Sequence, residues 1–317
     1  MNFKEGEVLY FNKPLGWTSF KVVGHARYHI CRRIKEKKLK VGHAGTLDPL
    51  ATGVMIVCTG KATKRIEEFQ YHTKEYVATI RLGATTPSYD LEHEIDATYP
   101  TEHITRGLVE ETLKKFIGEI QQVPPAFSAC MVNGKRAYDL ARKGEEVELK
   151  PKLLVIDEIE LLDDGLDIAE PWIKVRVVCS KGTYIRTLCQ DIGEKLGCGA
   201  AMASLVRTQV DRFQLEDALT LERIEALQKE NELEPFILPV DQLFEYYDKI
   251  VVADKAICYL QNGNKINAGF CQGNIPGEDG KKVRMYDTKD RFYAIYRWDA
   301  GQNVFVNDKM FFPHTEA

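Results

Sequence analysis

Two segments of this chain, residues 76–82 and 173–179, alternate between apolar and more polar residues at every second position. This period of two is typical of a β-strand with one buried face. In two other segments, 22–34 and 185–196, apolar residues recur every three or four positions, as on a helix with one buried side. Strands and helices interspersed in this way predict an α+β fold, with a mixed sheet flanked by helices.

The ends of the two helices carry capping signals. Thr18 or Ser19 is predicted to cap the first helix and Thr183 the second, because a hydroxyl at this position accepts a hydrogen bond from a free backbone N–H. Gly197 is predicted to end the second helix, since glycine readily adopts the left-handed conformation found there.

A chain of 317 residues is expected to form one large domain and a small one. We place the large domain at residues 1–248. The polar segment at about 88–150, with a helix predicted over 107–117, is interpreted as an insertion in it. The acidic stretch 216–248 is predicted to be helical.

The tail, residues 249–317, differs in character from the rest. A short helix is predicted at 254–260, and strands are predicted at 281–287, 291–298 and 303–312. The tail is therefore expected to be a small β-rich, barrel-like domain.

Several protein classes are excluded by composition. The most uniformly apolar stretch, 54–58, is far shorter than the roughly 20 residues of a membrane span, and no signal peptide is recognisable, so we expect a cytoplasmic protein without membrane contact. The eight cysteines have neither zinc-site nor disulfide-scaffold spacing, which predicts reduced thiols and no metal.

Charge is distributed unevenly along the chain. The net charge is −4, but residues 1–75 hold 14 Lys and Arg against 7 Asp and Glu, whereas residues 145–170 hold 2 against 10. The basic stretch 32–40 precedes the loop 42–53, and Lys61 and Lys64 follow it. Such a run is often only a solvated helix end, but cations on both sides of a loop favour an RNA-binding face.

The loop 42–53 contains three glycines and an Asp48-Pro49 step. Proline moves Asp48 out of the helical region, and the glycines allow a sharp bend around it, so the carboxylate is held rigidly. A rigid carboxylate beside cations is expected to be ionised and can act as a nucleophile or electrostatic stabiliser. An ordinary turn is the alternative interpretation.

The residues of this loop closely resemble the catalytic motif of the bacterial tRNA pseudouridine synthase B family. The resemblance extends over about residues 7–245, in the same order along the chain, through Asn12-Lys13-Pro14, Lys74-Glu75-Tyr76, Gln122-Val123-Pro124-Pro125 and Lys181-Gly182-Thr183-Tyr184-Ile185-Arg186. It implies a pseudouridine-synthase-like fold. It also implies an isomerase that turns the uridine at position 55 in the T-loop of tRNA into pseudouridine, after base flipping, without metal or cofactor.

Roles for single residues follow from the same resemblance. Asp48 would be the catalytic carboxylate, attacking the ribose or the base or removing a sugar proton. Tyr76 would stack on the flipped base, and its hydroxyl would be a candidate proton acceptor. Arg186 would pair with Asp48, the alternative from sequence alone being a solvated surface arginine.

The resemblance also implies a set of substrate-binding residues. Tyr184 would line the pocket, Leu205 would shield the base from water, and His43 would pack into the T-loop and hold it open. Lys61 and Lys64 would grip phosphates. The expected partner is the T-arm stem-loop of tRNA, with no obligate protein partner, and we expect a monomer.

Two features depart from a full match. The family usually has a lysine where this chain has Met131, which is expected to pack under the Pro124-Pro125 turn. The tail resembles the PUA-like RNA-binding modules of related enzymes only loosely, and a capping domain without RNA contact is the alternative. A tRNA-binding folding factor whose isomerase activity is incidental is the alternative function.

Overall fold

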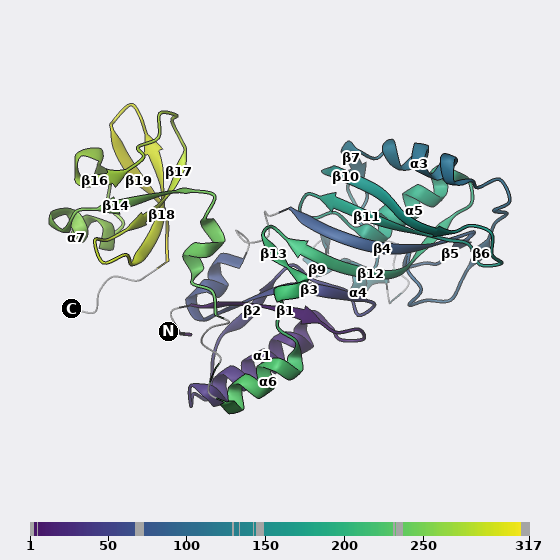
Figure 1. The fold of residues 1–317 in the computed structure, drawn as a ribbon, viewed down its shortest axis with the longest axis horizontal. Helices are drawn as coiled ribbons and strands as arrows, with labels where there is room; N and C mark the ends of the chain where they lie inside the picture. Colours follow the sequence, from purple (N-terminus) through teal and green to yellow (C-terminus); the bar gives the residue numbers. More distant parts are fainter. Residues whose placement is uncertain are drawn as a thin grey trace.

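The computed structural model describes residues 3–311 except 5, 67–72, 129, 133, 142, 144–148, 231 and 233–236. Figure 1 shows a large twisted sheet with helices, joined to a smaller β-rich part near the C-terminus. This agrees with the predicted α+β fold and the β-rich tail.

Nine strands form the large sheet. They are β1 Val8–Lys13, β2 Val41–Ala44, β3 Ala51–Thr59, β4 Lys74–Leu82, β7 Gly118–Gln122, β10 Lys152–Gly165, β11 Trp172–Cys179, β12 Ala200–Val210 and β13 Phe213–Gln214. The order is β1-β3-β12-β4-β11-β10-β7, with β2 on β3 and β13 on β12. Because β3 and β12 are parallel and the other described pairs are antiparallel, the sheet is mixed, as predicted.

The two segments with period two are neighbouring central strands of this sheet. β4 and β11 pair antiparallel, with Tyr76 opposite Val177 and Ile80 opposite Ile173. Every second residue of each strand is buried. The alternation of apolar and polar residues therefore predicted correctly which side chains of these two strands are buried.

Two pairs of helices cover the sheet. Helices α1 (Ser19–Arg33) and α6 (Leu221–Glu230) pack on β1 and β3, while α3 (Arg106–Lys114) and α5 (Ile185–Leu196) pack on β4, β11 and β12. Ala51 belongs to the core under α5, whereas Met55 and Val57 belong to the core under α1. Since these three residues lie on one face of β3, the loop preceding β3 lies where the two helix pairs meet.

The predicted caps were right for one helix and wrong for the other. The Thr18 side chain accepts a hydrogen bond from the Lys21 N–H at the start of α1. For α5, the N-cap is Tyr184, without a side-chain bond, and Thr183 instead donates its hydroxyl to the Ser180 carbonyl. Gly197 ends α5 with φ +74°, as predicted.

The segment that we interpret as an insertion contributes to the main sheet as well as to loops. It contains β6 (Ala97–Thr98), α3, β7, the hairpin of β8 (Met131–Val132) and β9 (Lys135–Arg136), and α4 (Ala137–Ala141); β6 pairs with β5 (Ala84–Thr85). Among its described residues, the acidic stretch 216–248 is helical in α6 and in the short 3-10 helices η2 (Leu215–Asp217) and η4 (Val240–Phe244).

Six strands make the C-terminal sheet. These are β14 Asp248–Val252, β15 Ile266–Asn267, β16 Cys271–Gly273, β17 Lys282–Tyr286, β18 Phe292–Asp299 and β19 Val304–Met310, with the short helices η5 Asp254–Ala256, α7 Ile257–Gln261 and η6 Ala268–Phe270. The three strands predicted from sequence are β17, β18 and β19.

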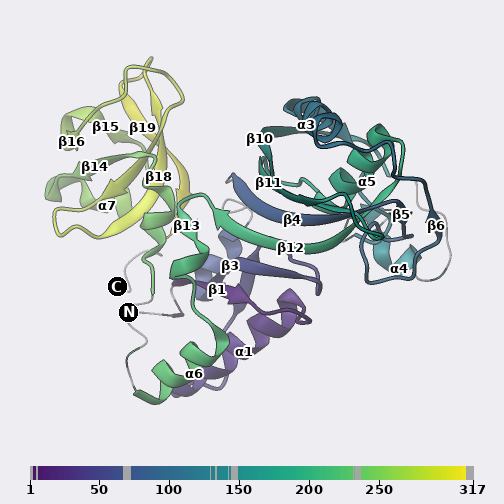
Figure 2. The ribbon, with the colours of Figure 1, turned by 45° about the vertical axis from the view of Figure 1, so that its right-hand side comes forward.

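A shared apolar core joins the C-terminal sheet to the large sheet. Ile56 and Cys58 of β3 cluster with Phe244, Phe292 and Ile295. Figure 2 shows the C-terminal part beside β13. The division at residues 248 and 249 remains our prediction.

Among the described residues, every helix is too short or too polar to span a membrane.

Candidate active site

The loop between β2 and β3 is held by hydrogen bonds from three other segments. The Ser19 hydroxyl both accepts from the N–H and donates to the carbonyl of Leu47, each at 2.9 Å. The Gly16 N–H donates to the Pro49 carbonyl at 2.9 Å. The Leu50 N–H donates to Glu92 Oε1 at 2.9 Å. Asp48, between these anchors, is therefore held in one position, as expected from sequence.

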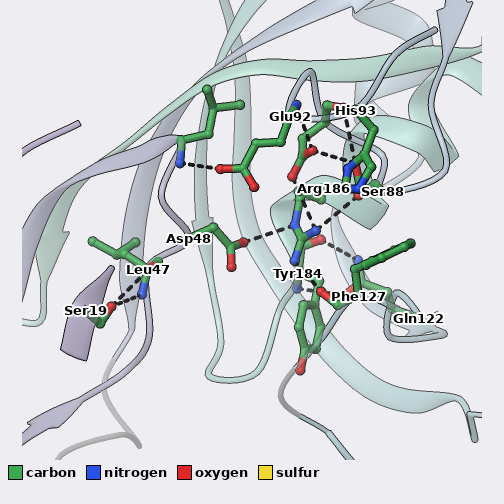
Figure 3. A network of polar contacts seen from close by, with 12 residues as sticks. Ser19, Leu47, Asp48, Ser88, Glu92, His93, Gln122, Phe127, Tyr184 and Arg186 are labelled. Carbon is green, nitrogen blue, oxygen red and sulfur yellow. Dashed lines mark hydrogen bonds and ion pairs between the residues drawn. The ribbon is translucent and has the colours of Figure 1, made fainter. Parts of the chain in front are cut away.

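Arg186 extends toward this loop from the first turn of α5 (Figure 3). Its Nε atom lies 3.0 Å from Asp48 Oδ2. The arginine side chain is 7% exposed and the Asp48 side chain 38% exposed. The alternative of a solvated surface arginine is therefore wrong, and the carboxylate is the accessible member of the pair.

A second carboxylate, Asp90, lies on the other side of the arginine. Its Oδ2 atom is 3.3 Å from Arg186 Nη1, and its side chain is 1% exposed. The Ser88 hydroxyl donates to Asp90 Oδ1 at 2.6 Å, and the Glu92 N–H donates to the same oxygen at 3.1 Å. Asp90 thus holds Arg186 from the buried side.

The remaining donors of Arg186 bind main-chain carbonyls. Nη1 donates to Ser88 O at 3.2 Å and Nη2 to Phe127 O at 2.9 Å. Contacts to two carboxylates and two carbonyls require the planar fork of a guanidinium. The arginine therefore has one orientation, which it imposes on Asp48.

Opposing effects act on the pKa of Asp48. Burial raises this pKa, Arg186 lowers it, Asp90 raises it and Lys13 lowers it, and the net result lies above the ordinary value. The expectation from sequence that Asp48 is ionised took only the neighbouring cations into account. The carboxylate is consequently a stronger base than a free aspartate.

Lys13 lies fully buried beneath the loop. Its ammonium group donates to Trp17 O at 2.6 Å and Pro14 O at 3.0 Å, and it lies 3.5 Å from Pro49 O. Burial lowers its pKa to about 8. Sequence reasoning quoted this lysine as part of a motif but assigned it no role.

Tyr76 and Leu205 line the apolar side of the site. Both are 7% exposed and belong to one core cluster with Leu47 and Ala51. Leu205 pairs with Ala51 across the parallel β3–β12 contact. Burial raises the pKa of the Tyr76 hydroxyl, and the nearby Arg207 guanidinium opposes this only in part.

Tyr184 lies immediately before α5. Its backbone N–H donates to Gln122 Oε1 at 2.8 Å, and its carbonyl accepts from Gln122 Nε2 at 3.1 Å. Its hydroxyl lies 3.2 Å from Cys130 Sγ. The predicted residues therefore come to one region from four segments: Asp48 from the loop before β3, Tyr76 from β4, Tyr184 and Arg186 from the start of α5, and Leu205 from β12.

His43 lies on β2, opposite Val57 and five residues before Asp48. Burial, followed by the charge of Arg207, lowers its pKa. The ring is thus neutral near pH 7. No group of three or more His, Cys, Asp or Glu side chains in the described part of the chain is arranged to hold a metal ion.

Lys61 and Lys64 do not lie at this site. They are in the 3-10 helix η1 (Gly60–Arg65), which follows the nine residues of β3, whereas Asp48 precedes them. At about 3.3 Å per residue, the strand separates them from Asp48 by roughly 30 Å. The Gly60 N–H donates to Lys40 O at 2.8 Å, so the two basic stretches meet each other instead of surrounding Asp48.

The expectation for Met131 was wrong. Its side chain is 64% exposed in β8 and does not pack beneath the proline turn. The side chain of the nearby Lys135 lies outside the described part of the structure.

Sequence reasoning missed Asp90, Glu92 and Arg207. Asp90 and Glu92 lie in the acidic stretch 90–96. The sequence of this stretch does not show which carboxylates bind other residues and which are only solvated. Arg207 is 1% exposed and donates to Val54 O at 2.6 Å and Gly45 O at 3.2 Å. In the sequence it is followed by the polar residues Thr208 and Gln209, so the local pattern does not distinguish it from a solvated arginine.

Comparison with known families gives consistent matches. The profile of the TruB family pseudouridylate synthase N-terminal domain matches residues 32–185, and that of the tRNA pseudouridylate synthase B C-terminal domain matches residues 186–245.

Two curated relatives illustrate the range of similarity. The chain is 82% identical over 219 residues to a tRNA pseudouridine synthase B of Bacteroides fragilis. The aligned region covers 69% of this chain and 92% of the relative. It is 41% identical over 289 residues to the Clostridium kluyveri protein of the same name, covering 91% of this chain and 94% of the relative.

Solved structures share the fold. A Cbf5-Nop10-Gar1 complex contains a chain that matches with a TM-score of 0.71 at 25% identity, covering 98% of this chain and 86% of that one. A chain of an H/ACA RNP bound to a substrate RNA containing 2'-deoxyuridine matches with a TM-score of 0.71 at 24% identity, covering 98% of this chain and 87% of that one.

Proposed function

This chain belongs to the TruB family of pseudouridylate synthases and has the isomerase activity of tRNA pseudouridine synthase B, and we propose that it acts on the uridine at position 55 in the T-loop of tRNA with Asp48 as the catalytic carboxylate. The observation that carries this assignment is the contact of Asp48 with Arg186. The pair combines a partly exposed carboxylate with a buried cation of fixed orientation.

The reaction rearranges one nucleotide without any net redox change. The bond between ribose C1′ and uracil N1 breaks, the uracil turns, and a bond forms between C1′ and C5. The C5 proton leaves and N1 gains a proton, so the atoms balance. A carboxylate at the glycosidic bond and a pocket that retains the detached base are the two requirements that the protein must meet.

The apolar side of the site suits a flipped base. Tyr76 provides a flat ring on which uracil can stack, and Leu205 shields the base from water. Stacking on an aromatic ring contributes about 1–3 kcal/mol per base. The raised pKa of Tyr76 keeps its hydroxyl neutral, which suits contact with an uncharged base.

Arg186 and Tyr184 shape the polar side. Arg186 aims the Asp48 carboxylate, and Asp90 keeps the arginine in place from behind. Tyr184 closes the pocket from the start of α5, while the neutral His43 ring enters the T-loop and holds it open after the uridine has left its stack.

Contacts further away grip the rest of the RNA. Lys61 and Lys64 bind phosphates about one strand length from the reacting base. The C-terminal domain, residues 249–317, acts as a PUA-like RNA-binding module that the shared core holds against β3.

An Asp48→Asn variant tests the proposal. An unmodified T-arm stem-loop is incubated with each protein in the presence of a chelator, and pseudouridine is mapped chemically. The wild type is expected to form product, whereas Asp48→Asn should form none while its RNA affinity stays within a few-fold. The exposed Asp96→Asn serves as a matched control.

The same experiment distinguishes the proposed function from the alternative, a tRNA-binding folding factor. Product formation by Asp48→Asn would contradict the assigned mechanism. A folding factor with incidental isomerisation predicts that Asp48→Asn still refolds tRNA as well as the wild type does.

A further inference from the structure

Helix α1 has an unusual charge composition for a surface helix. Its 15 residues include Lys21, Arg27, Arg32 and Arg33 but no aspartate or glutamate. Residues such as Val22, Ala26 and Ile30 are buried against α6 and β1. The outward side therefore presents positive charge without the interspersed acids that usually balance it.

A groove runs along this outward side. Its volume is about 600 Å³, and it is lined by Gly24, Arg27, Tyr28, Arg32, Lys35 and Lys37, among others. A Cβ atom at Gly24 would meet nothing within 4 Å, so the groove is open above this position.

One acidic residue, Glu36, also lines the groove. Its carboxylate lies 2.7 Å from the Lys4 ammonium and is thus already paired. No other carboxylate of the described residues lies within ion-pair distance of Arg27, Arg32, Lys35 or Lys37. The groove consequently favours an anionic ligand.

An exposed aromatic residue lies among these cations. The Tyr28 side chain is 54% exposed. Arg32 Nη1 donates to the Tyr28 hydroxyl at 2.7 Å, and the guanidinium carbon lies 5.5 Å from the ring centre. Basic residues interleaved with an aromatic ring are typical of surfaces that bind nucleic acid.

The groove starts near the catalytic loop. Ser19, the first residue of α1, bonds directly to Leu47 beside Asp48. At 1.5 Å per residue, Gly24 lies about 8 Å and Arg32 about 20 Å along the helix from this contact. An RNA helix that leads away from a uridine at Asp48 could therefore run along α1.

On the basis of the proposed function, we propose that the groove on α1 binds phosphates of the RNA stem that carries the target uridine, up to about 20 Å from the reacting base. This surface is separate from the Asp48 pocket. It makes affinity depend on stem length and leaves the chemistry at Asp48 unaltered.

The test compares one neutralised variant with two hairpins. Arg27→Gln, Arg32→Gln and Lys35→Gln are combined in the full chain. One hairpin has a short stem of about five base pairs below the T-loop, and the other a stem of about twelve. Affinity is measured as a function of KCl, and pseudouridine formation at saturating RNA in a single turnover.

We expect the triple variant to bind the long hairpin roughly 10- to 100-fold more weakly at about 0.1 M KCl, with a salt slope shallower by about 2–3. Its affinity for the short hairpin should change less than about threefold. A matched control neutralises Arg223 and Lys229 of α6, which pair with Glu230 and Glu225, and should match the wild type. Thermal melting checks that each variant folds.

Other results would overturn the proposal. If the triple variant binds the long hairpin as tightly as the wild type does, the groove does not bind the RNA stem and its ligand is something other than RNA. Equal losses with both hairpins, or an equal loss in the α6 control, would show a non-specific charge effect. Failure of the wild type to convert either hairpin would instead refute the proposed function, so the two failures are distinguishable.

Discussion

The two ends of β3 differ in how they are built. The loop before β3 carries an acidic side chain and is held by bonds from Ser19, Glu92 and Arg186. The helix η1 after β3 carries the exposed cations Lys61 and Lys64, next to the equally exposed Lys40.

The two ends of β3 would therefore contribute to function in different ways. Under the proposed function, the first end requires positions fixed within about 0.5 Å, because its contacts are short and partly buried. The role proposed for the second end relies on long-range attraction, which tolerates movement and falls with salt. Substitutions should therefore affect mainly the rate at one end and mainly the affinity at the other.

After the complete loss expected from Asp48→Asn, the largest effect is expected from Arg186→Lys. Lysine is a point charge and cannot contact Asp48, Asp90 and two carbonyls together. We expect the single-turnover rate to fall on the order of a thousandfold, equivalent to about 4 kcal/mol. The same change at Arg212, which pairs with Glu245 on the surface, should cost less than about twofold. Comparable losses at both arginines would contradict the role of the buried contacts.

Asp90→Asn should have the next largest effect. The amide can still accept hydrogen bonds but no longer holds Arg186 by charge, so we expect a rate loss of roughly 10- to 100-fold.

The pH dependence sharpens this test. If ionised Asp48 is the active form, the rate falls as pH decreases through its raised pKa. Because Asp90 contributes to raising this pKa, Asp90→Asn should move the acidic limb of the pH–rate profile to lower pH. An unchanged limb would show that Asp48 does not control it.

Glu92 offers a smaller test of the loop. Glu92→Ala removes the acceptor of the Leu50 N–H, and we expect a rate loss of about three- to tenfold, since a hydrogen bond is worth about 1 kcal/mol net. Glu92→Gln keeps an acceptor oxygen at this position and should retain most of the rate. Equal losses in single-turnover assays of both variants would mean that the charge, rather than the hydrogen bond, is what matters.

The smallest effect on rate is expected at the other end of β3. Combined Lys61→Gln and Lys64→Gln substitutions should weaken RNA binding a few-fold and make the salt slope shallower by about 2. The rate at saturating RNA should fall less than about twofold. Titrations at several KCl concentrations measure both quantities, and a large rate loss would place these lysines in the chemistry after all.

Much of the fold was predictable from local patterns. The strands around Tyr76 and Val177 were recognisable because alternate side chains face the core, and Gly197 because few other residues end a helix in the left-handed conformation. The candidate site residues were found through a motif resemblance. Thr183 was misassigned because α5 begins at Ile185, which makes Tyr184 the N-cap and leaves the Thr183 hydroxyl to bond within the preceding turn, to the Ser180 carbonyl.

Long-range positions were not predictable. Lys61 and Lys64 are close to Asp48 in the sequence, yet an extended strand between them carries them away. Asp90 is distant from Arg186 in the sequence and meets it only because the segment after β5 folds over the start of α5.

The sequence by itself determined which segments form strands and helices, and it contained a loop in which proline and glycines constrain Asp48. These are local properties, governed by backbone sterics and by the alternation of apolar residues. Only the tertiary structure decided that two carboxylates share one buried arginine and that the basic stretches gather at the far end of β3. Those contacts join residues distant in the sequence, and their geometry is set by how the sheet and its helices pack.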